Sequence, residues 1–216
     1  MLRGVIFDVD GTLLDTEKIY IQAWREAGKC FGYQIPDEAL MRTRAINRQR
    51  AIEIFKEYLG PDFCYEKLLP ERIRIAEELI NQSANLLKPG VNELLDTLDT
   101  RGIRLAVASS TNLEKTKAHL THAGLLHRFH GVVGGDMIEK GKPNPDIFLF
   151  AASLLGLHPE ECIVVEDSPA GIEAAFRGGF RGILIPDCVP ANDKTSAMSY
   201  RVMRDLYELI DILEEF

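Results

Sequence analysis

Five short, continuously apolar segments restrict this sequence to one class of fold. They cover residues 4–9, 103–108, 131–134, 162–165 and 182–185, and the third of them is weaker and rich in glycine. Their hydrophobicity does not alternate, which is typical of strands buried on both faces. Between them, apolar residues recur three or four positions apart, as from Val91 to Leu98. Because helical crossovers connect parallel strands, the pattern predicts an α/β, doubly wound parallel sheet.

One region interrupts this alternation. From Thr16 to Leu87 the sequence shows amphipathic helices and no convincing strand. The region begins directly after the first strand and its loop, and the chain returns at Lys88-Pro89-Gly90, a sequence suited to a hinge or turn. We therefore expect an α/β core domain of residues 1–15 and 88–216, and an inserted α-helical cap domain of residues 16–87 that acts as a lid.

Composition limits the classes of partner. The chain has 216 residues, 46% hydrophobic and 27% charged, which is ordinary for a globular protein. Its net charge of -8 argues against a broad nucleic-acid surface, although a local anion pocket remains compatible with it. The apolar runs are strand-sized and the N-terminus does not resemble a signal peptide, so we expect no membrane partner and a cytoplasmic location. We also expect a monomer or a weak oligomer. Four cysteines far apart in sequence are expected to be reduced.

Polar residues follow the ends of the apolar segments. The first segment delivers Asp8 and Asp10 at its end, the second is followed by Ser109, Ser110, Thr111 and Asn112, the third leads to Lys142, and the fourth is followed by Glu166 and Asp167. In open parallel sheets, ligands bind beyond the carboxyl ends of the strands. Several buried carboxylates need a compensating cation, and oxygen ligands favour a hard ion. The pattern predicts a Mg²⁺ site.

The two aspartates suit a division of labour, because Gly11 allows the loop to redirect Asp10: one carboxylate attacks and the other moves protons. Plainer interpretations exist for the other groups. Ser109 to Asn112 can cap a helix that starts near Leu113, which is compatible with binding a phosphate there. Lys142 in isolation would be a solvated lysine, and Glu166 with Asp167 could belong to the N-cap region of a helix starting at Pro169.

The motifs DVDGT, AVASST, GKPNPDIF and VVEDSPAGIEAA, in this order, resemble those of the haloacid dehalogenase superfamily. The resemblance implies that Asp8 is the nucleophile and Asp10 the general acid and base. It implies that Ser109 and Lys142, with Ser110 and Asn112 beside them, bind the phosphoryl group. Mg²⁺ would be held by Asp8, the Asp10 backbone carbonyl and Asp167, supported by Glu166. The implied fold is a Rossmann-like sheet of order 5-4-1-2-3 with an α-helical cap.

The position of the insertion resembles the subgroup that contains β-phosphoglucomutase and its phosphatase relatives. Dehalogenases of the superfamily lack the second aspartate and need no metal, so Asp10 and Asp167 argue against carbon-halogen cleavage. We expect a Mg²⁺-dependent phosphatase that hydrolyses a small phosphorylated metabolite, such as a sugar phosphate, through an aspartyl phosphate. The alternative is a mutase of the β-phosphoglucomutase type.

Three positions of the insertion bear on that choice, and they are expected to contact substrate: Thr16, Tyr20 and Arg48. Mutases of this group carry a His shortly after the hinge Thr, and Thr16 is followed by Glu17-Lys18-Ile19-Tyr20 instead. The segment Ala45 to Arg48, however, resembles the cap loop whose Arg meets a second phosphate. The surrounding basic cluster, Arg42, Arg44, Arg48 and Arg50, is interpreted as an exposed helix face in preference to an anion-selecting surface.

Overall fold

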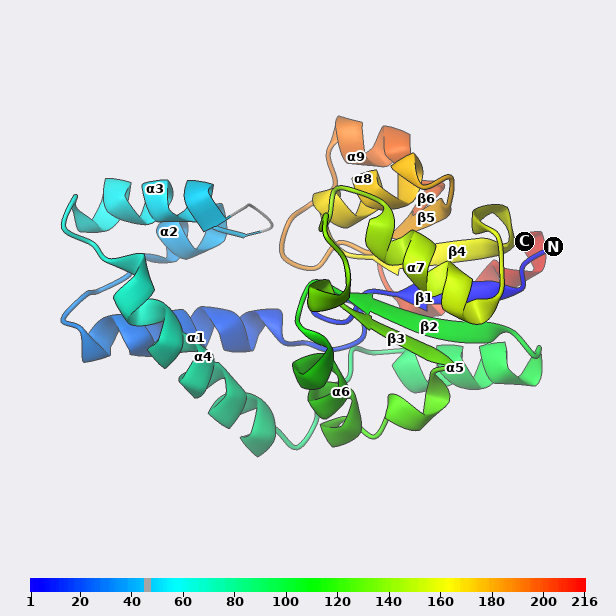
Figure 1. Cartoon of the computed structure of the whole chain (residues 1–216), viewed down its shortest axis with the longest axis horizontal. Helices are drawn as coiled ribbons and strands as arrows, with labels where there is room; N and C mark the ends of the chain where they lie inside the picture. The colour runs from blue at the N-terminus through cyan, green and yellow to red at the C-terminus, as the bar shows by residue number, and fades with distance from the viewer. Residues whose placement is uncertain (45–47) are drawn as a thin grey trace. The chain divides into compact units, whose positions relative to one another are not determined.

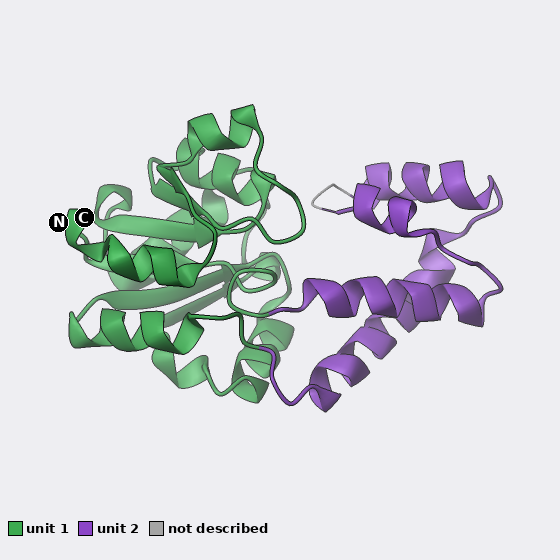
Figure 2. Ribbon diagram, turned by 180° about the vertical axis from the view of Figure 1, so that it is seen from behind, with its two compact units in different colours: residues 1–14, 87–216 green, residues 15–86 purple. Residues whose placement is uncertain are grey.

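The chain forms two compact units (Figure 2). Their structure is a computed structural model, and it describes residues 1–44 and 48–216. Unit 1 comprises residues 1–14 and 87–216, and unit 2 comprises residues 15–86. Each junction lies one residue before the one expected from the sequence. No helix in the described part of the chain combines the length and the apolar composition that crossing a membrane would require.

Unit 1 contains a parallel sheet of six strands in the order β3-β2-β1-β4-β5-β6. The strands are β1 (Gly4–Phe7), β2 (Arg104–Ser109), β3 (Gly131–Gly134), β4 (Cys162–Glu166), β5 (Arg181–Leu184) and β6 (Arg201–Val202). The α/β doubly wound class is confirmed, and the first five strands have the expected order 5-4-1-2-3. The sixth strand extends the sheet beyond β5. It was not predicted because its two residues are exposed and form no apolar run.

Helices connect the strands of unit 1 (Figure 1). They are α5 (Val91–Thr100), α6 (Leu113–His122), α7 (Asp146–Leu155), α8 (Pro169–Arg177), α9 (Asp193–Met198) and α10 (Leu206–Asp211). Short 3₁₀ helices cover Leu126–Arg128, Gly135–Met137, Pro159–Glu161 and Leu213–Glu215. The described chain thus ends in α10 followed by a 3₁₀ turn.

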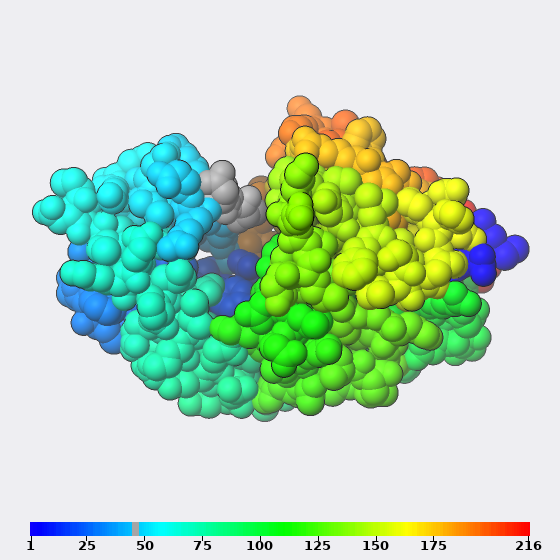
Figure 3. Space-filling model, viewed as in Figure 1, coloured from blue at the N-terminus to red at the C-terminus, as the bar shows by residue number. Residues whose placement is uncertain are grey.

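Both faces of the sheet are covered, as continuous rather than alternating hydrophobicity requires. On one face, Ile6 and Val164 pack in a buried cluster with Phe148 of α7 and Ala174 of α8. In the space-filling view, the yellow-green side chains of α7 hide the strands beneath them (Figure 3). On the other face, strand residues such as Val107 are also fully buried. The central strands β1 and β4 thus lie in a dry core that fixes the residues at their ends.

All regular structure in the described residues of unit 2 is helical. Its helices are α1 (Glu17–Cys30), α2 (Asp37–Arg42), α3 (Arg48–Leu59) and α4 (Tyr65–Gln82). α1 packs against α4 through Ala23, Ala27 and Ala76, whose small side chains let the two backbones approach. A second cluster gathers Phe55 of α3, Phe63 of the turn before α4, and other apolar side chains that include Leu40 of α2 and Leu68 of α4. Unit 2 therefore has a hydrophobic core of its own.

Candidate active site

The strand register of unit 1 brings the predicted acidic residues together. Phe7 pairs with Val107 on one side and with Val165 on the other. The next residue along each strand therefore lies beside its neighbours, and the Asp8 amide donates to the Val165 carbonyl. Because the three strands run in parallel, their carboxyl ends meet at the same edge of the sheet. Asp8 and Glu166 consequently project from adjacent strand ends.

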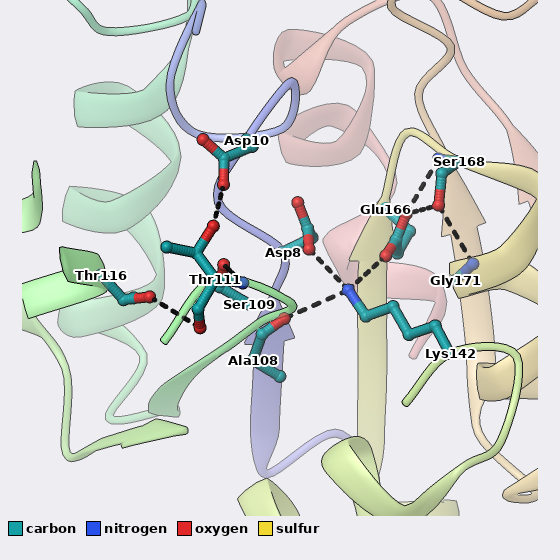
Figure 4. Close-up of polar contacts among 10 residues, drawn as sticks. All are labelled: Asp8, Asp10, Ala108, Ser109, Thr111, Thr116, Lys142, Glu166, Ser168 and Gly171. Carbon is teal, nitrogen blue, oxygen red and sulfur yellow. Dashed lines mark hydrogen bonds and ion pairs between the residues drawn. The ribbon is translucent and has the colours of Figure 1, made fainter. Parts of the chain in front are cut away.

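Lys142 lies between these two carboxylates (Figure 4). Its Nζ is 2.5 Å from Oδ1 of Asp8 and 2.6 Å from Oε1 of Glu166, and it also donates to the carbonyl oxygen of Ala108 at 3.2 Å. All three side chains are buried, with at most 10% of any one exposed. The ammonium group also lies 4.9 Å from the centre of the Phe148 ring. Lys142 is thus a fixed internal cation and not the solvated lysine of the plainer interpretation.

The charges in this cluster depend on one another. Burial raises the pKa of Asp8 to about 8, with Lys142 opposing the shift and Glu166 and Asp10 adding to it. Burial by itself would lower the pKa of Lys142, but Asp8 and Glu166 raise it above its usual value. Lys142 therefore stays protonated, whereas Asp8 at neutral pH is mostly in its acid form. A further positive charge near Asp8 would favour its ionised form.

Glu166 holds Lys142 from the far side of the site. Its Oε2 accepts hydrogen bonds from the backbone amide and the hydroxyl of Ser168, both at 2.8 Å. The Ser168 hydroxyl in turn accepts from the Gly171 amide and caps α8. A Cβ on Gly171 would lie 1.9 Å from Cδ of Glu166, so only glycine leaves room there. The predicted metal role of Glu166 stays a prediction, while its contacts favour positioning Lys142.

Asp10 follows Asp8 in the loop after β1. Its Oδ2 accepts a hydrogen bond of 3.2 Å from the Thr111 hydroxyl (Figure 4). The loop turns at Gly11, whose φ of 89° lies in the left-handed region that glycine adopts without strain. The buried Ser109 accepts through Oγ from the Thr111 amide at 3.0 Å. The loops after β1 and β2 are therefore tied to each other through Thr111.

Of the other predicted phosphate ligands, Ser110 is exposed and Asn112 caps α6, where its Oδ1 accepts from the Lys115 amide at 3.0 Å. This confirms the capping interpretation. The Leu113 amide donates to Oδ1 of Asp136 at 2.7 Å. Two amides of the first turn of α6 already have acceptors, so this helix end offers a phosphate fewer free donors than the sequence suggested.

The acidic residues fit a magnesium ion by their chemistry. Asp167 lies beside the Asp10 loop, since a Cβ on Gly11 would lie 2.4 Å from Oδ2 of Asp167. Within residues 1–44 and 48–216, no three His, Cys, Asp or Glu side chains form a complete metal cluster. Mg²⁺ suits such a site because one or two carboxylates commonly hold it together with waters and phosphate oxygens. A cation beside Asp8 would also favour the ionised form of this carboxyl group, which burial disfavours.

The substrate positions predicted in the insertion all lie in unit 2. Thr16 is buried just before α1, and the Tyr20 ring lies 4.3 Å from the guanidinium carbon of Arg72. Arg48 forms an exposed ion pair of 3.2 Å with Glu66. The predicted cap-loop residues 45–47 lie outside the described residues. Any contact of these side chains with substrate stays a prediction.

Several contacts of the site had no separate sequence signal. The Ala108 carbonyl that accepts from Lys142 is a backbone group, and any residue type could supply it. Ser168 and Thr111 do stand inside the motifs, in EDS and SST, but the sequence does not show which carboxylate each one contacts. Asp136 caps a helix from 23 positions further along the chain, a distance at which the sequence gives no indication.

The sequence is similar to proteins of known family. A family model of haloacid dehalogenase-like hydrolases matches residues 2–179. A phosphorylated carbohydrates phosphatase of Thermotoga maritima is 33% identical over 184 residues, which are 84% of this chain and 84% of that protein. A beta-phosphoglucomutase of Bacillus subtilis is 31% identical over 185 residues, 82% of this chain and 80% of that protein.

A solved structure shows the same fold. The crystal structure of CbbY from Rhodobacter sphaeroides in complex with phosphate is similar with a TM-score of 0.80 and 27% identity. The likeness covers 97% of this chain and 96% of that one. It therefore includes unit 2 as well as the sheet of unit 1.

Proposed function

Since the chain belongs to the haloacid dehalogenase-like hydrolase family and is a phosphoric monoester hydrolase of that family, we propose that it cleaves a small sugar phosphate through a phosphoenzyme on Asp8. The observation that carries the proposal is the buried Asp8 carboxylate at the end of β1, held 2.5 Å from Nζ of Lys142. The printed substrate class of the Thermotoga maritima relative, phosphorylated carbohydrates, supports the choice of a sugar phosphate.

In the first step, an oxygen of Asp8 forms a bond to phosphorus while the bond from phosphorus to the ester oxygen breaks. Asp10 gives its proton to the departing oxygen. Thr111 supports this role, because its hydroxyl donates to Oδ2 of Asp10 and orients the carboxyl group. The free alcohol then leaves, and the phosphoryl group remains on Asp8.

In the second step, water attacks phosphorus and the bond between phosphorus and Asp8 breaks. The Asp10 carboxylate takes the proton of the attacking water, which returns Asp10 to its acid form and releases inorganic phosphate. Lys142, protonated and hydrogen-bonded on three sides, supplies a fixed positive charge to the phosphoryl oxygens in both steps. Ser109, Ser110 and Asn112 are proposed to contact the same oxygens.

Asp8, Asp167 and the backbone carbonyl of Asp10 would hold Mg²⁺ in this proposal. The ion would reduce the repulsion between an anionic nucleophile and an anionic phosphate ester. The raised pKa of Asp8 supports it, since a neighbouring cation would favour the ionised carboxylate that the attack on phosphorus needs. The chain's own cation, Lys142, is already engaged with both carboxylates and cannot neutralise the substrate alone.

Two observations favour hydrolysis of a sugar phosphate over a mutase reaction. No His occurs on α1, where mutases of this group carry one, and position 20 is a Tyr stacked on Arg72. Arg48, the candidate for a second phosphate, pairs with Glu66 instead. The similarity to a beta-phosphoglucomutase keeps the mutase as the alternative to be tested.

The test compares the two products. The protein is incubated with β-glucose 1-phosphate and Mg²⁺, with and without glucose 1,6-bisphosphate, while inorganic phosphate and glucose 6-phosphate are both measured; other sugar phosphates are assayed in parallel. We expect phosphate release from at least one sugar monophosphate without any bisphosphate. Formation of glucose 6-phosphate much faster than phosphate release would show a mutase and contradict the proposal.

A further inference from the structure

Arg44 differs from the other members of its basic cluster. Arg42, Arg48 and Arg50 have side chains that are 41–58% exposed, and each pairs with a nearby glutamate. The Arg44 side chain is only 8% exposed. α2 ends at Arg42, so Arg44 lies in the turn that follows and not on the exposed helix face. The expectation of a uniformly exposed basic face is therefore wrong at this position.

The buried guanidinium of Arg44 is not satisfied. Its Nη2 lies 3.5 Å from Oε2 of Glu17, close enough for an ion pair. Among the described residues, however, neither Nε nor Nη2 of Arg44 has a hydrogen-bond acceptor. A buried arginine normally has its N–H groups hydrogen-bonded, because leaving them without partners costs free energy. An acceptor that is not part of the described chain would account for this geometry.

A second arginine lies in the same place. Arg72 of α4 has its guanidinium carbon 4.3 Å from the Tyr20 ring centre and 5.8 Å from that of Trp24. Stacking on aromatic faces fixes the plane of a guanidinium and leaves its edge available for hydrogen bonds. The Nε of Arg72 is buried and has no acceptor in the described part of the chain, and none of the carboxylates there pairs with it.

Both arginines line one cavity of about 150 Å³ that lies wholly within unit 2. This is well above the roughly 10–15 Å³ that a single water needs, so the cavity has room for a group such as a carboxylate or a phosphate. Glu17 and Thr43 also line it. The Thr43 hydroxyl is already used, since it donates to the Leu40 carbonyl. Two guanidinium groups against one carboxylate leave the lining with one excess positive charge.

We propose that Arg44 and Arg72 form an oxyanion-binding site in unit 2, which takes a carboxylate or phosphate group of a small molecule. Arginine donors in a fixed fork match the oxygens of both groups, and the excess charge favours an anion over a neutral ligand. The proposal does not depend on the phosphatase activity, because all of its residues lie in unit 2. The anion is either free in solution or is a second acidic group of the substrate.

The direct test observes the two side chains in the whole protein. The Nε–H resonances of arginine are followed by NMR in ¹⁵N-labelled wild type without Mg²⁺, during titration with sodium acetate or inorganic phosphate at constant ionic strength. We expect saturable shifts of the Arg44 and Arg72 signals with one common dissociation constant. Arg74 is the internal control, because it lies on α4 with Arg72 but is exposed and paired with Glu71. Shifts at Arg44 and Arg72 no larger than at Arg74 would overturn the proposal.

Variants sharpen this test. Glu17→Gln removes the competing carboxylate and should tighten anion binding by a factor of roughly three or more, since one opposing charge nearby is lost. Arg44→Gln should abolish the saturable shift of Arg72, and Arg74→Gln should leave it unchanged. Should Arg44→Gln not fold, Glu17→Gln still decides, because unchanged or weaker binding in that variant contradicts a role for the excess positive charge.

The source of the anion is determined in the Asp8→Asn protein, where nothing is turned over. Gluconate 6-phosphate and glucose 6-phosphate differ in one carboxylate and are added separately with Mg²⁺. If the acid ester moves the Arg44 resonance at much lower concentration than acetate does, the anion belongs to the substrate. If gluconate 6-phosphate and acetate move the Arg44 resonance at similar concentrations, the site binds a free anion. Failure of the phosphatase proposal would not affect either result.

Discussion

The ammonium nitrogen of Lys142 lies 2.5 Å from Oδ1 of Asp8, although 134 positions separate the two residues in sequence. The same nitrogen contacts Glu166 and the Ala108 carbonyl, so each of its three N–H groups has an acceptor. A charge held in this way does not need to reorganise when negative charge develops nearby, and such preorganised charges make large contributions to catalysis.

Lys142→Ala should therefore lower kcat/KM for a sugar phosphate by about 10²-fold or more. Lys140→Ala is the matched control, because Lys140 is exposed two positions earlier, and it should stay within about twofold of wild type. Steady-state kinetics on the purified variants provide the measurement. A change smaller than threefold in Lys142→Ala would contradict the role of this residue.

Asp8→Asn should abolish turnover, by about 10³-fold or more, because an amide oxygen is a poor nucleophile in place of the carboxylate. The protein should stay folded. Since burial disfavours the charged form of Asp8, the thermal midpoint without Mg²⁺ should equal or exceed that of wild type. Asp193→Asn, at an exposed position, is the control for loss of one carboxylate. Wild-type turnover by folded Asp8→Asn would rule out Asp8 as nucleophile.

Removal of divalent cations with EDTA should eliminate turnover, and added Mg²⁺ should restore it. Asp167→Asn should raise the Mg²⁺ concentration for half-maximal activity by about tenfold or more, because a carboxylate is the preferred ligand of this ion. Activity is measured against total Mg²⁺ in wild type, Asp167→Asn and Asp193→Asn. Full activity in the presence of EDTA would exclude the metal site.

Gly171→Ala separates helix propensity from packing. Alanine favours a helix over glycine by about 1 kcal/mol, so α8 in isolation would gain stability. The added Cβ, however, would meet Glu166 at 1.9 Å, and overpacking of this kind typically costs about 1–3 kcal/mol. We expect a lower thermal midpoint and reduced activity, since Glu166 positions Lys142. Gly141→Ala, which meets nothing within 4 Å, is the control for stability.

The thiols should differ in reactivity. Burial raises the pKa of Cys162 from its usual value near 9 to about 11, whereas Cys30 is exposed. At pH 8 about one in a thousand Cys162 side chains is a thiolate, and iodoacetamide should label Cys30 at least ~100-fold faster, as mass spectrometry would show. The pKa of Cys162 is higher in the folded protein than in the unfolded chain. Its contribution to the free energy of unfolding is therefore complete below about pH 9 and falls as the pH rises towards 11. Equal labelling rates of Cys30 and Cys162 in the native protein would contradict the predicted difference in reactivity.

The sequence was sufficient to locate the acids of the site because they stand at the ends of buried strands. Asp8 and Glu166 end runs of apolar residues, and parallel strands place such ends together whatever the details of packing. Lys142 lies farther along the chain, in the loop after β3. Periodicity predicted the class of sheet, whereas the order of the first five strands was implied by the resemblance to the haloacid dehalogenase superfamily.

The remaining features depend on individual contacts. Arg42 and Arg44 are the same type of residue in the same basic segment, so the sequence does not distinguish them. They differ in burial because α2 ends at Arg42, which leaves Arg42 exposed and Arg44 buried in the turn that follows. β6 has two exposed residues and leaves no hydrophobic signal. Glu166 was expected near a metal because an acid next to Asp167 is indistinguishable from it in sequence, whereas its contacts with Lys142 and Ser168 exist only in the fold.

The distance along the chain between the members of the Lys142 cluster has a consequence for biosynthesis. Asp8 leaves the ribosome first, and Glu166 follows 158 positions later. At about 5–20 residues per second, roughly 10–30 s separate their synthesis. During that interval the nascent chain carries an aspartate without the lysine that holds it, and β1 lacks its neighbour β4. The Asp8 carboxylate is therefore made first but cannot reach its buried setting until Lys142 and β4 have followed it.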